Sequence, residues 1–92
     1  MRAYSHGAVE VVETRTFVCG VGQDIEQCLL RNIGDVTVYI GGRNVDATGD
    51  RMGFPLEPGE RQELKSFEYD SIEVWAVVTD DHTGHLAFLV SA

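Results

Sequence analysis

Apolar and polar residues alternate along three stretches of the chain. The stretches read DVTVYI (35–40), SIEVWAVV (71–78) and HLAFLV (85–90). A period of two residues places the apolar side chains on one face of an extended strand. β-Branched and aromatic residues are enriched in all three, and Gly or Asp residues bound them. We therefore predict a β-strand at each stretch.

No segment of ten or more residues keeps a clean apolar spacing of 3.6 residues, so no helix is predicted. The first two predicted strands adjoin and are also compatible with one continuous strand that bends. A short edge strand is expected near 52–54. The predicted strands are 8–13, 14–20, 26–33, 35–41, 61–65, 71–79 and 85–91.

Three connections carry turn signals. NIGDV reads as a tight turn, and TDDHTGHL reads as a hairpin loop between two strands. In LEPGE, Pro58 and Gly59 suit the two central positions of a type II turn. Together these features predict an all-β fold: a single small antiparallel β-sandwich, jelly-roll-like or a small barrel, over residues 8–92. Residues 1–7 are expected to form an extended N-terminal arm.

The size and charge of the chain restrict its function. Its 92 residues suffice for one domain, and a domain this small gains from self-association. Fifteen acids against seven Lys and Arg give a net charge of −8. This charge repels nucleic acid and can complement a basic protein surface. No apolar run has the length of a membrane span or a signal peptide, so we expect no membrane association and synthesis in the cytoplasm.

The two cysteines, Cys19 and Cys28, are separated by eight residues that read as a connection between strands. If those two strands pair, the thiols face each other and a disulfide is feasible. The alternative is two reduced, half-buried thiols that act as small hydrophobic side chains.

The Gly-rich segment GGRNVDATGDRMGFP follows a predicted strand and ends at Phe54-Pro55. A phosphate-binding loop leads into a helix N-terminus, which is not predicted here, so we interpret the segment as a connector. His82 and His85 lie near two aspartates, a set that could bind a metal, but a solvated turn explains the same residues. We predict no metal, no cofactor and no enzymatic activity, because no nucleophile motif or paired-carboxylate cleft is recognisable.

Several large apolar side chains fall on the strand faces opposite the predicted core. These are Trp75, Val77, Leu89 and Tyr39. Aromatic residues are enriched at protein interfaces, so the four residues predict a patch that binds another subunit. The alternative is that the 41–55 loop or the N-terminal arm covers them within the same chain.

The segment from Leu29 to Val90 resembles small virion proteins of tailed bacteriophages. The resemblance is carried by LLRNIG (29–34), VYIG (38–41), LEPGE (56–60) and the last two strands. It implies a β-sandwich of the capsid decoration, cement or minor capsid type, located on the capsid surface of the virion. It implies two partners, the major capsid protein and further copies of the chain in a homodimer or homotrimer.

In such proteins an N-terminal arm often reaches a neighbouring subunit, which assigns arm contacts to Arg2, Tyr4 and Val9. Two alternative functions remain open. One is a tail or head-tail structural protein of a phage. The other is a small β-sandwich module that binds glycans or another ligand, with Trp75 and Tyr39 as a stacking platform.

Overall fold

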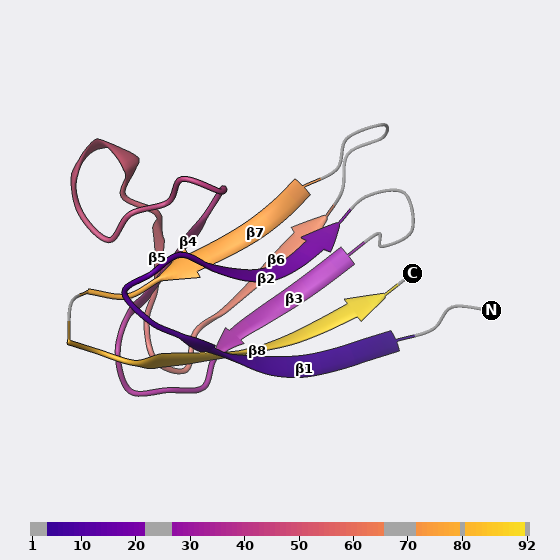
Figure 1. Ribbon diagram of the computed structural model, residues 1–92. Helices are drawn as coiled ribbons and strands as arrows, with labels where there is room; N and C mark the ends of the chain where they lie inside the picture. The colour runs from indigo at the N-terminus through magenta and orange to yellow at the C-terminus, as the bar shows by residue number, and fades with distance from the viewer. Residues whose placement is uncertain (1–3, 22–26, 66–71, 80, 92) are drawn as a thin grey trace.

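The computed structural model describes residues 4–21, 27–65, 72–79 and 81–91, which form eight strands and one short 3-10 helix (Figure 1). The 3-10 helix η1 (Gly49–Arg51) lies in the connection between β4 and β5. The strands are β1 (Tyr4–Val11), β2 (Thr16–Val21), β3 (Gln27–Asn32), β4 (Val38–Gly41), β5 (Phe54–Leu56), β6 (Arg61–Lys65), β7 (Ile72–Val77) and β8 (Gly84–Ser91).

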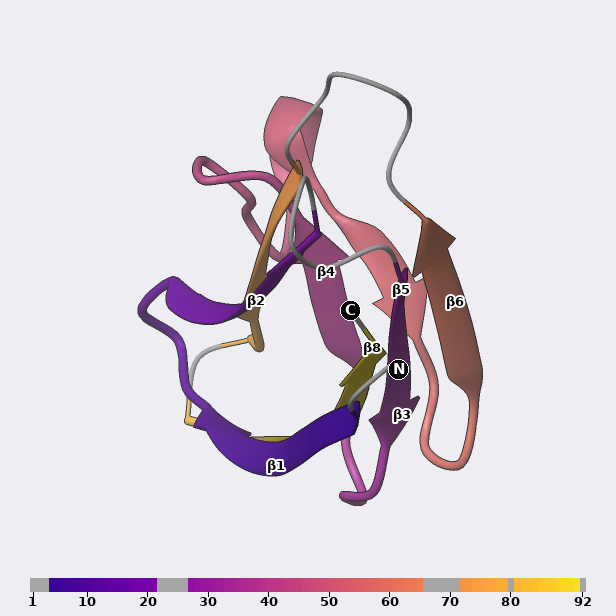
Figure 2. The same cartoon turned by 90° about the vertical axis from the view of Figure 1, so that its right-hand side faces the viewer.

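The strands form two four-stranded antiparallel sheets that pack face to face (Figure 2). One sheet has the order β1-β8-β3-β6, and the other has the order β2-β7-β4-β5. This is the strand order of an eight-stranded jelly roll. The predicted all-β sandwich is therefore confirmed.

The prediction of a hairpin at TDDHTGHL is wrong. β7 and β8 belong to different sheets, so the connection between them crosses from one layer to the other. The tight turn at NIGDV likewise crosses between the sheets, because β3 and β4 lie in different layers. Among the strands of the described residues, only β4 and β5 are both consecutive in sequence and paired in a sheet. Alternation defines the face of a strand but not its neighbour, which is why the pairing was mispredicted.

The core lies between the two sheets and follows the predicted alternation. Val38 and Ile40 of β4, Val74 and Ala76 of β7, and Leu86 of β8 are all buried. Strand β2 departs from simple alternation, because its register with β7 shifts between Phe17 and Cys19. The most completely buried side chains are Leu30, Leu56, Leu86, Val11, Val38, Val78, Asn32 and Cys28.

Residues 4–7 belong to a strand and not to the extended arm that we expected. β1 begins at Tyr4 and pairs with β8 from Tyr4↔Ser91 through Val11↔Gly84. Gly7 permits this pairing, because a Cβ atom there would lie 2.8 Å from Cζ of Phe88. Residues 1–3 of the predicted arm lie outside the described residues.

Asn32 is the one buried polar side chain among the described residues, with 1% of its surface exposed. Its Nδ2 donates hydrogen bonds to the carbonyl oxygens of Val36 and Leu56, both at 2.8 Å. Its Oδ1 accepts a hydrogen bond from the backbone N–H of Gly34 at 3.0 Å. Its own backbone carbonyl accepts from the N–H of Gly59 at 2.9 Å. Asn32 thus joins the β3–β4 turn to the end of β5 and the turn that follows.

The predicted type II turn at Pro58-Gly59 is confirmed. The N–H of Glu60 donates to the carbonyl oxygen of Glu57 at 2.9 Å, and Gly59 has a φ of +87°. A positive φ at the third turn position is the geometry that requires glycine. The turn carries the chain from β5 in one sheet to β6 in the other.

Candidate interaction surface

Phe17 and Trp75 form an aromatic pair on the outer face of the sheet β2-β7-β4-β5. They are opposite each other across β2 and β7. Their ring centroids are 5.5 Å apart and their planes meet at 70°, an edge-to-face contact. Phe17 is 49% exposed. The pair therefore presents rigid aromatic surface to the outside, and we call it the aromatic pair.

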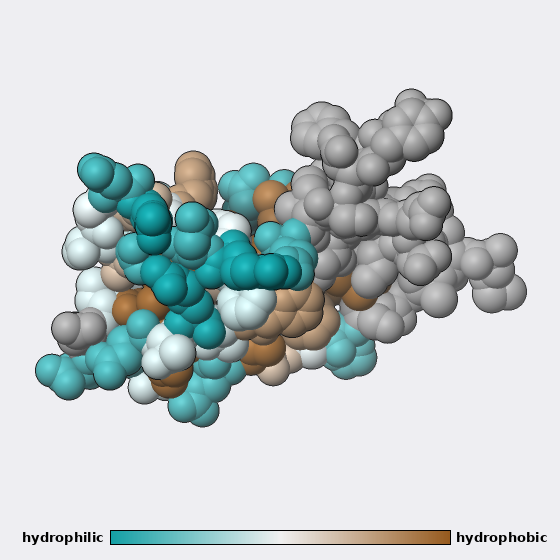
Figure 3. Space-filling model, turned by 45° about the horizontal axis from the view of Figure 1, so that its top comes forward, coloured by the Kyte–Doolittle hydropathy of each residue, from teal (hydrophilic) through white to brown (hydrophobic). Residues whose placement is uncertain are grey.

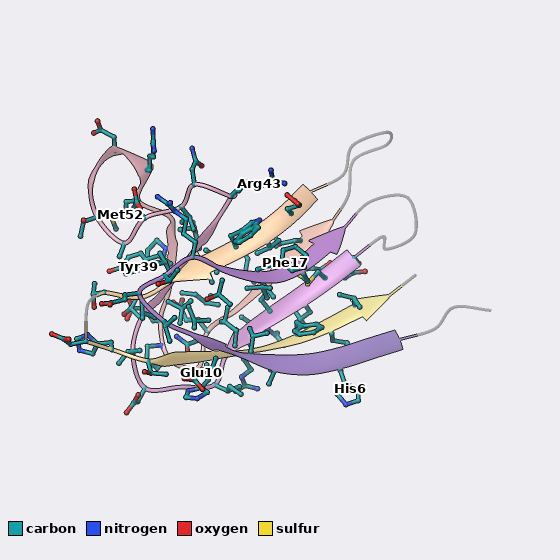
Figure 4. All side chains as sticks on the ribbon, viewed as in Figure 1. His6, Glu10, Phe17, Tyr39, Arg43 and Met52 are labelled. Carbon is teal, nitrogen blue, oxygen red and sulfur yellow. The ribbon has the colours of Figure 1, made fainter. Side chains whose placement is uncertain are left out.

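The indole nitrogen of Trp75 has no hydrogen-bond acceptor among the residues that the structure describes, although the atom itself is buried. A buried indole N–H normally donates a hydrogen bond. Tyr39 is half-buried on β4 in the same sheet (Figure 4), opposite Val77 of β7. Both Trp75 and Tyr39 thus lie on the outer face predicted for them, and Phe17 joins them there.

Val77 does not belong to an exposed patch. It lies on the outer face but is only 4% exposed, and it lines a hollow together with residues 46–48 of the β4–β5 connection. Val45 of the same connection is 3% exposed, and its Cγ2 packs against Gly41 and Gly53, where a Cβ atom would overlap it. The low exposure of Val77 agrees with coverage by the 41–55 loop, which stays a prediction.

Two arginines hold the β4–β5 connection over the sheet. Nε of Arg15 donates to the carbonyl oxygen of Val45 at 2.8 Å, and its Nη2 contacts Asp46 Oδ1 at 2.7 Å. Nη2 of Arg43 donates to both carboxylate oxygens of Glu73 on β7, at 3.0 and 2.8 Å. Both ion pairs are partly exposed, so each contributes little to stability and mainly orients the connection.

Leu89 lies on the opposite side of the molecule from Trp75 and Tyr39. It is 40% exposed on β8, in the sheet β1-β8-β3-β6, where its neighbours are His6 of β1 and Leu29 of β3. The four predicted interface residues therefore do not form one patch. β4 and β7 lie in one sheet and β8 lies in the other, so the outward side chains of β8 face the opposite direction from those of β4 and β7.

The predicted arm residues are placed only in part. Val9 is half-buried in β1, within the sheet and not in an arm. Tyr4 contributes its backbone to β1, opposite Ser91. Arg2 lies outside the described residues.

The surface seen from the upper side of Figure 1 shows small apolar areas separated by hydrophilic side chains (Figure 3). One apolar hollow of about 480 Å³ opens between β4 and β5 of one sheet and β6 of the other. Glu73 is the one ionisable side chain in its described lining, and Arg43 neutralises it. This hollow suits an apolar side chain better than a reacting substrate. Its described lining is Ile40, Gly41, Gly42, Phe54, Gln62, Leu64, Glu73 and Val74.

Cys19 and Cys28 lie in different sheets, on strands that do not pair, and both are buried as free thiols. They contact each other across the interior. A hydrogen bond from the Cys28 thiol lowers the pKa of Cys19, against the opposing effect of burial. The same hydrogen bond, with burial added, raises the pKa of Cys28. Both cysteines are thus free thiols packed in the core. They approach each other across the interior and not along paired strands.

The two histidines considered for a metal lie in different elements, His82 in the β7–β8 connection and His85 in β8. Nδ1 of His82 lies 3.0 Å from Oγ1 of Thr79 in the β7–β8 connection. His85 lies on the outer face of β8 opposite Glu10 of β1. Among the described residues, no three His, Cys, Asp or Glu side chains are grouped so that they could hold a metal ion.

Comparison with known proteins adds no assignment. No family model matches the chain, and no curated protein matches it. Within the described part of the chain, no helix has the length and apolar character needed to cross a membrane.

Proposed function

We propose that this chain is a structural subunit of a tailed-phage virion that decorates the capsid, binding the major capsid protein and further copies of itself. The observation that carries the proposal is the aromatic pair. Phe17 is half-exposed, and Trp75 beside it has an indole N–H without an acceptor among the described residues.

The aromatic pair has the properties of an interface anchor. Trp and other aromatic residues dominate interface energies, because they bury a large rigid surface with little loss of conformational entropy. A partner carbonyl or carboxylate that accepts the Trp75 N–H would remove the cost of leaving this buried donor unpaired. Capsid binding at this face would therefore bury the apolar ring surface and supply an acceptor for the indole N–H.

The charge of the chain supports a basic protein surface as the partner. The net charge of −8 disfavours polyanions as binding partners and speeds encounter with a positively charged shell. Eight-stranded jelly rolls occur in viral capsid proteins, lectins and cupins, so the fold alone does not select a function. The resemblance to small phage virion proteins favours the capsid among these three.

A co-sedimentation assay tests the proposal. The chain is mixed with expanded capsid shells of its own phage that lack this subunit, and bound chain is measured against free concentration. We expect Phe17→Ala to raise the dissociation constant about tenfold or more, and Trp75→Phe to weaken binding through loss of the N–H donor. Ile33→Ala is the matched control, because Ile33 is a comparably exposed apolar residue elsewhere. Absence of shell binding by the parent chain, or equal losses for Phe17→Ala and Ile33→Ala, would refute the assignment.

A glycan-binding module is the second candidate, favoured by one feature. A hollow of about 360 Å³ with a polar described lining lies beside Tyr39, and Asp35, Thr79 and His82 contribute to it. Polar groups around an aromatic ring are typical of sugar sites. Titration with a panel of sugars, followed by Trp fluorescence, separates the candidates: a saturable shift that Tyr39→Ala abolishes would favour the glycan module over the capsid subunit.

A further inference from the structure

Each sheet of a jelly roll has two edge strands whose outward backbone N–H and C=O groups have no partner in the sheet. Here the edges are β1 and β6 in one sheet, and β2 and β5 in the other. Such edges readily pair with another chain, so proteins blunt them with proline, charge, irregular register or short length. The four edges of this molecule differ in this respect.

Three of the four edges carry such a device. β5 has only three residues and contains Pro55. β2 is irregular, because its register with β7 shifts between Phe17 and Cys19. β6 reads RQELK, with a charged residue at three of its five positions. These edges are unsuited to further pairing.

The fourth edge, β1, has no proline, no irregular register and no short length, and Glu10 is its one residue with a fixed charge. It is eight residues long, reads YSHGAVEV, and contains no proline, lysine or arginine. Its register with β8 runs without interruption over eight residue pairs. His6, Ala8 and Glu10 alternate on its outer face, and His6 projects away from the sandwich (Figure 4). Within the described part of the chain, β1 is therefore a long, regular edge with no strand paired on its outer side.

We propose that β1 pairs antiparallel with β1 of a second copy of this chain, about a two-fold axis at Ala8. In this register His6 of each copy lies opposite Glu10 of the other. A neutral imidazole N–H donates a hydrogen bond to the carboxylate, and a protonated imidazole adds an ion pair. An axis at Gly7 or at Val9 separates His6 from Glu10, so the complementary side chains select the axis at Ala8.

The inner face of β1 fits the same register. Val9 is half-buried in the single chain, and the pairing places it opposite Gly7 of the second copy. The Phe88 ring packs directly over Gly7, where a Cβ atom would lie 2.8 Å from Cζ. Val9 of one copy thus gains an apolar neighbour in the other. The two sheets β1-β8-β3-β6 become one continuous eight-stranded sheet with isologous symmetry.

This pairing deepens the proposed function by naming the surface through which copies of the subunit associate. It uses the β1 edge and leaves the aromatic pair, on the other sheet, free for the shell. Self-association is measured with the chain alone and shell binding with added shells, so failure of one is distinguishable from failure of the other.

Single cysteine substitutions on β1 test the register directly. Opposite residues of antiparallel strands have Cα atoms about 4.5–5.5 Å apart, within the range of a disulfide. We expect Ala8→Cys to form a cross-linked dimer with glutathione disulfide as the oxidant, which becomes reduced to two glutathione thiols. His6→Cys and Glu10→Cys place the paired thiols about 13 Å apart and should not cross-link. Ala87→Cys, on β8 next to Ala8, is the second control.

Charge reversal tests the contact between His6 and Glu10. By sedimentation equilibrium, Glu10→Lys should weaken the dimer about tenfold, because both symmetric contacts lose their attraction. The double variant His6→Glu with Glu10→Lys should restore the dimer, because it exchanges the two partners. Asp50→Lys makes the same change in net charge at an exposed site on η1 and should leave the association unchanged.

Three results would overturn the proposal. The first is a parent chain that stays monomeric at every concentration reached. The second is cross-linking of His6→Cys or Glu10→Cys as efficient as that of Ala8→Cys. The third is hydrogen-exchange protection of the β1 amides that arises only when capsid shells are added, which would assign the edge to a strand of the shell protein. Restored association in the double charge variant, together with cross-linking confined to Ala8→Cys, establishes the pairing.

Discussion

Replacing Asn32 by Asp changes one NH2 group to oxygen at the most constrained polar site among the described residues. The side chain keeps its size, and its Oδ1 still accepts from the N–H of Gly34. The two hydrogen bonds donated to the carbonyls of Val36 and Leu56 are lost. A carboxylate then faces two carbonyl oxygens where only 1% of the side chain is exposed.

The expected cost follows from those two contacts. A buried acceptor that loses its donor costs about 1–3 kcal/mol, so two carbonyls give about 2–6 kcal/mol. Burial of the new charge adds to this at neutral pH. A domain of this size has about 5–14 kcal/mol of stability in total, so Asn32→Asp removes a large fraction of it. Asn32→Ala loses the same two donors without introducing a charge and should be the milder change.

Urea denaturation followed by Trp75 fluorescence measures these differences. Asn44→Asp is the matched control, because Asn44 is exposed and the substitution adds the same charge to an acidic protein. Burial raises the pKa of the introduced carboxyl in the folded state above its unfolded value. The loss in free energy of unfolding relative to the parent is therefore largest above the pKa of the carboxyl in the folded state. It shrinks as the pH falls towards about 4.

An Asn32→Asp variant within about 0.5 kcal/mol of the parent at pH 7 would contradict this reasoning, since changes at exposed sites are of that size. Equal losses for Asn32→Asp and Asn44→Asp would contradict it as well. Either result would mean that the hydrogen bonds to the two carbonyls do not hold the turns together.

Three further predictions concern backbone, packing and thiol chemistry. Gly59→Ala should cost about 1–2 kcal/mol from its positive φ alone, because nothing lies within 4 Å of an added Cβ atom, whereas Gly42→Ala should be nearly neutral by the same denaturation assay. Gly53→Ala should cost more than Gly59→Ala, because its Cβ atom would lie 2.6 Å from a carbonyl oxygen of β4. Cys28→Ala removes the hydrogen bond that lowers the pKa of Cys19, so ultraviolet titration of the Cys19 thiolate should show that pKa rising. An unchanged or lowered Cys19 pKa would argue against contact between the two thiols.

The alternation of apolar residues predicted most of the core correctly. Val38, Ile40, Val74 and Leu86 face inward as expected, because a period of two residues is a local property of the chain. The type II turn at 57–60 was predictable for the same reason: Pro and Gly set their own backbone angles. These features need no knowledge of distant contacts.

Features that depend on distant contacts were not predictable. Strand pairing was one, because five of the six pairings join strands that are not consecutive in sequence. The low exposure of Val77 was another, because alternation identifies the face of a strand but not what covers that face. Phe17 was missed as an interface residue, because its outward orientation depends on the register shift in β2. The sequence contains no local signal for that shift.

The contacts of Asn32 explain what the resemblance to phage virion proteins can and cannot imply. The motifs LLRNIG and LEPGE are distant in sequence, yet Asn32 binds the turn of one and the end of β5 in the other. Both motifs therefore serve one structural purpose, the joining of two crossings between the sheets. A chain can keep them in order to fold as a jelly roll whatever its outer faces bind. The function must instead be tested on those faces, with Phe17→Ala and Glu10→Lys, which leave the Asn32 network intact. Loss of shell binding by Phe17→Ala without loss of stability would identify a binding residue, whereas Asn32→Asp can report only on the fold.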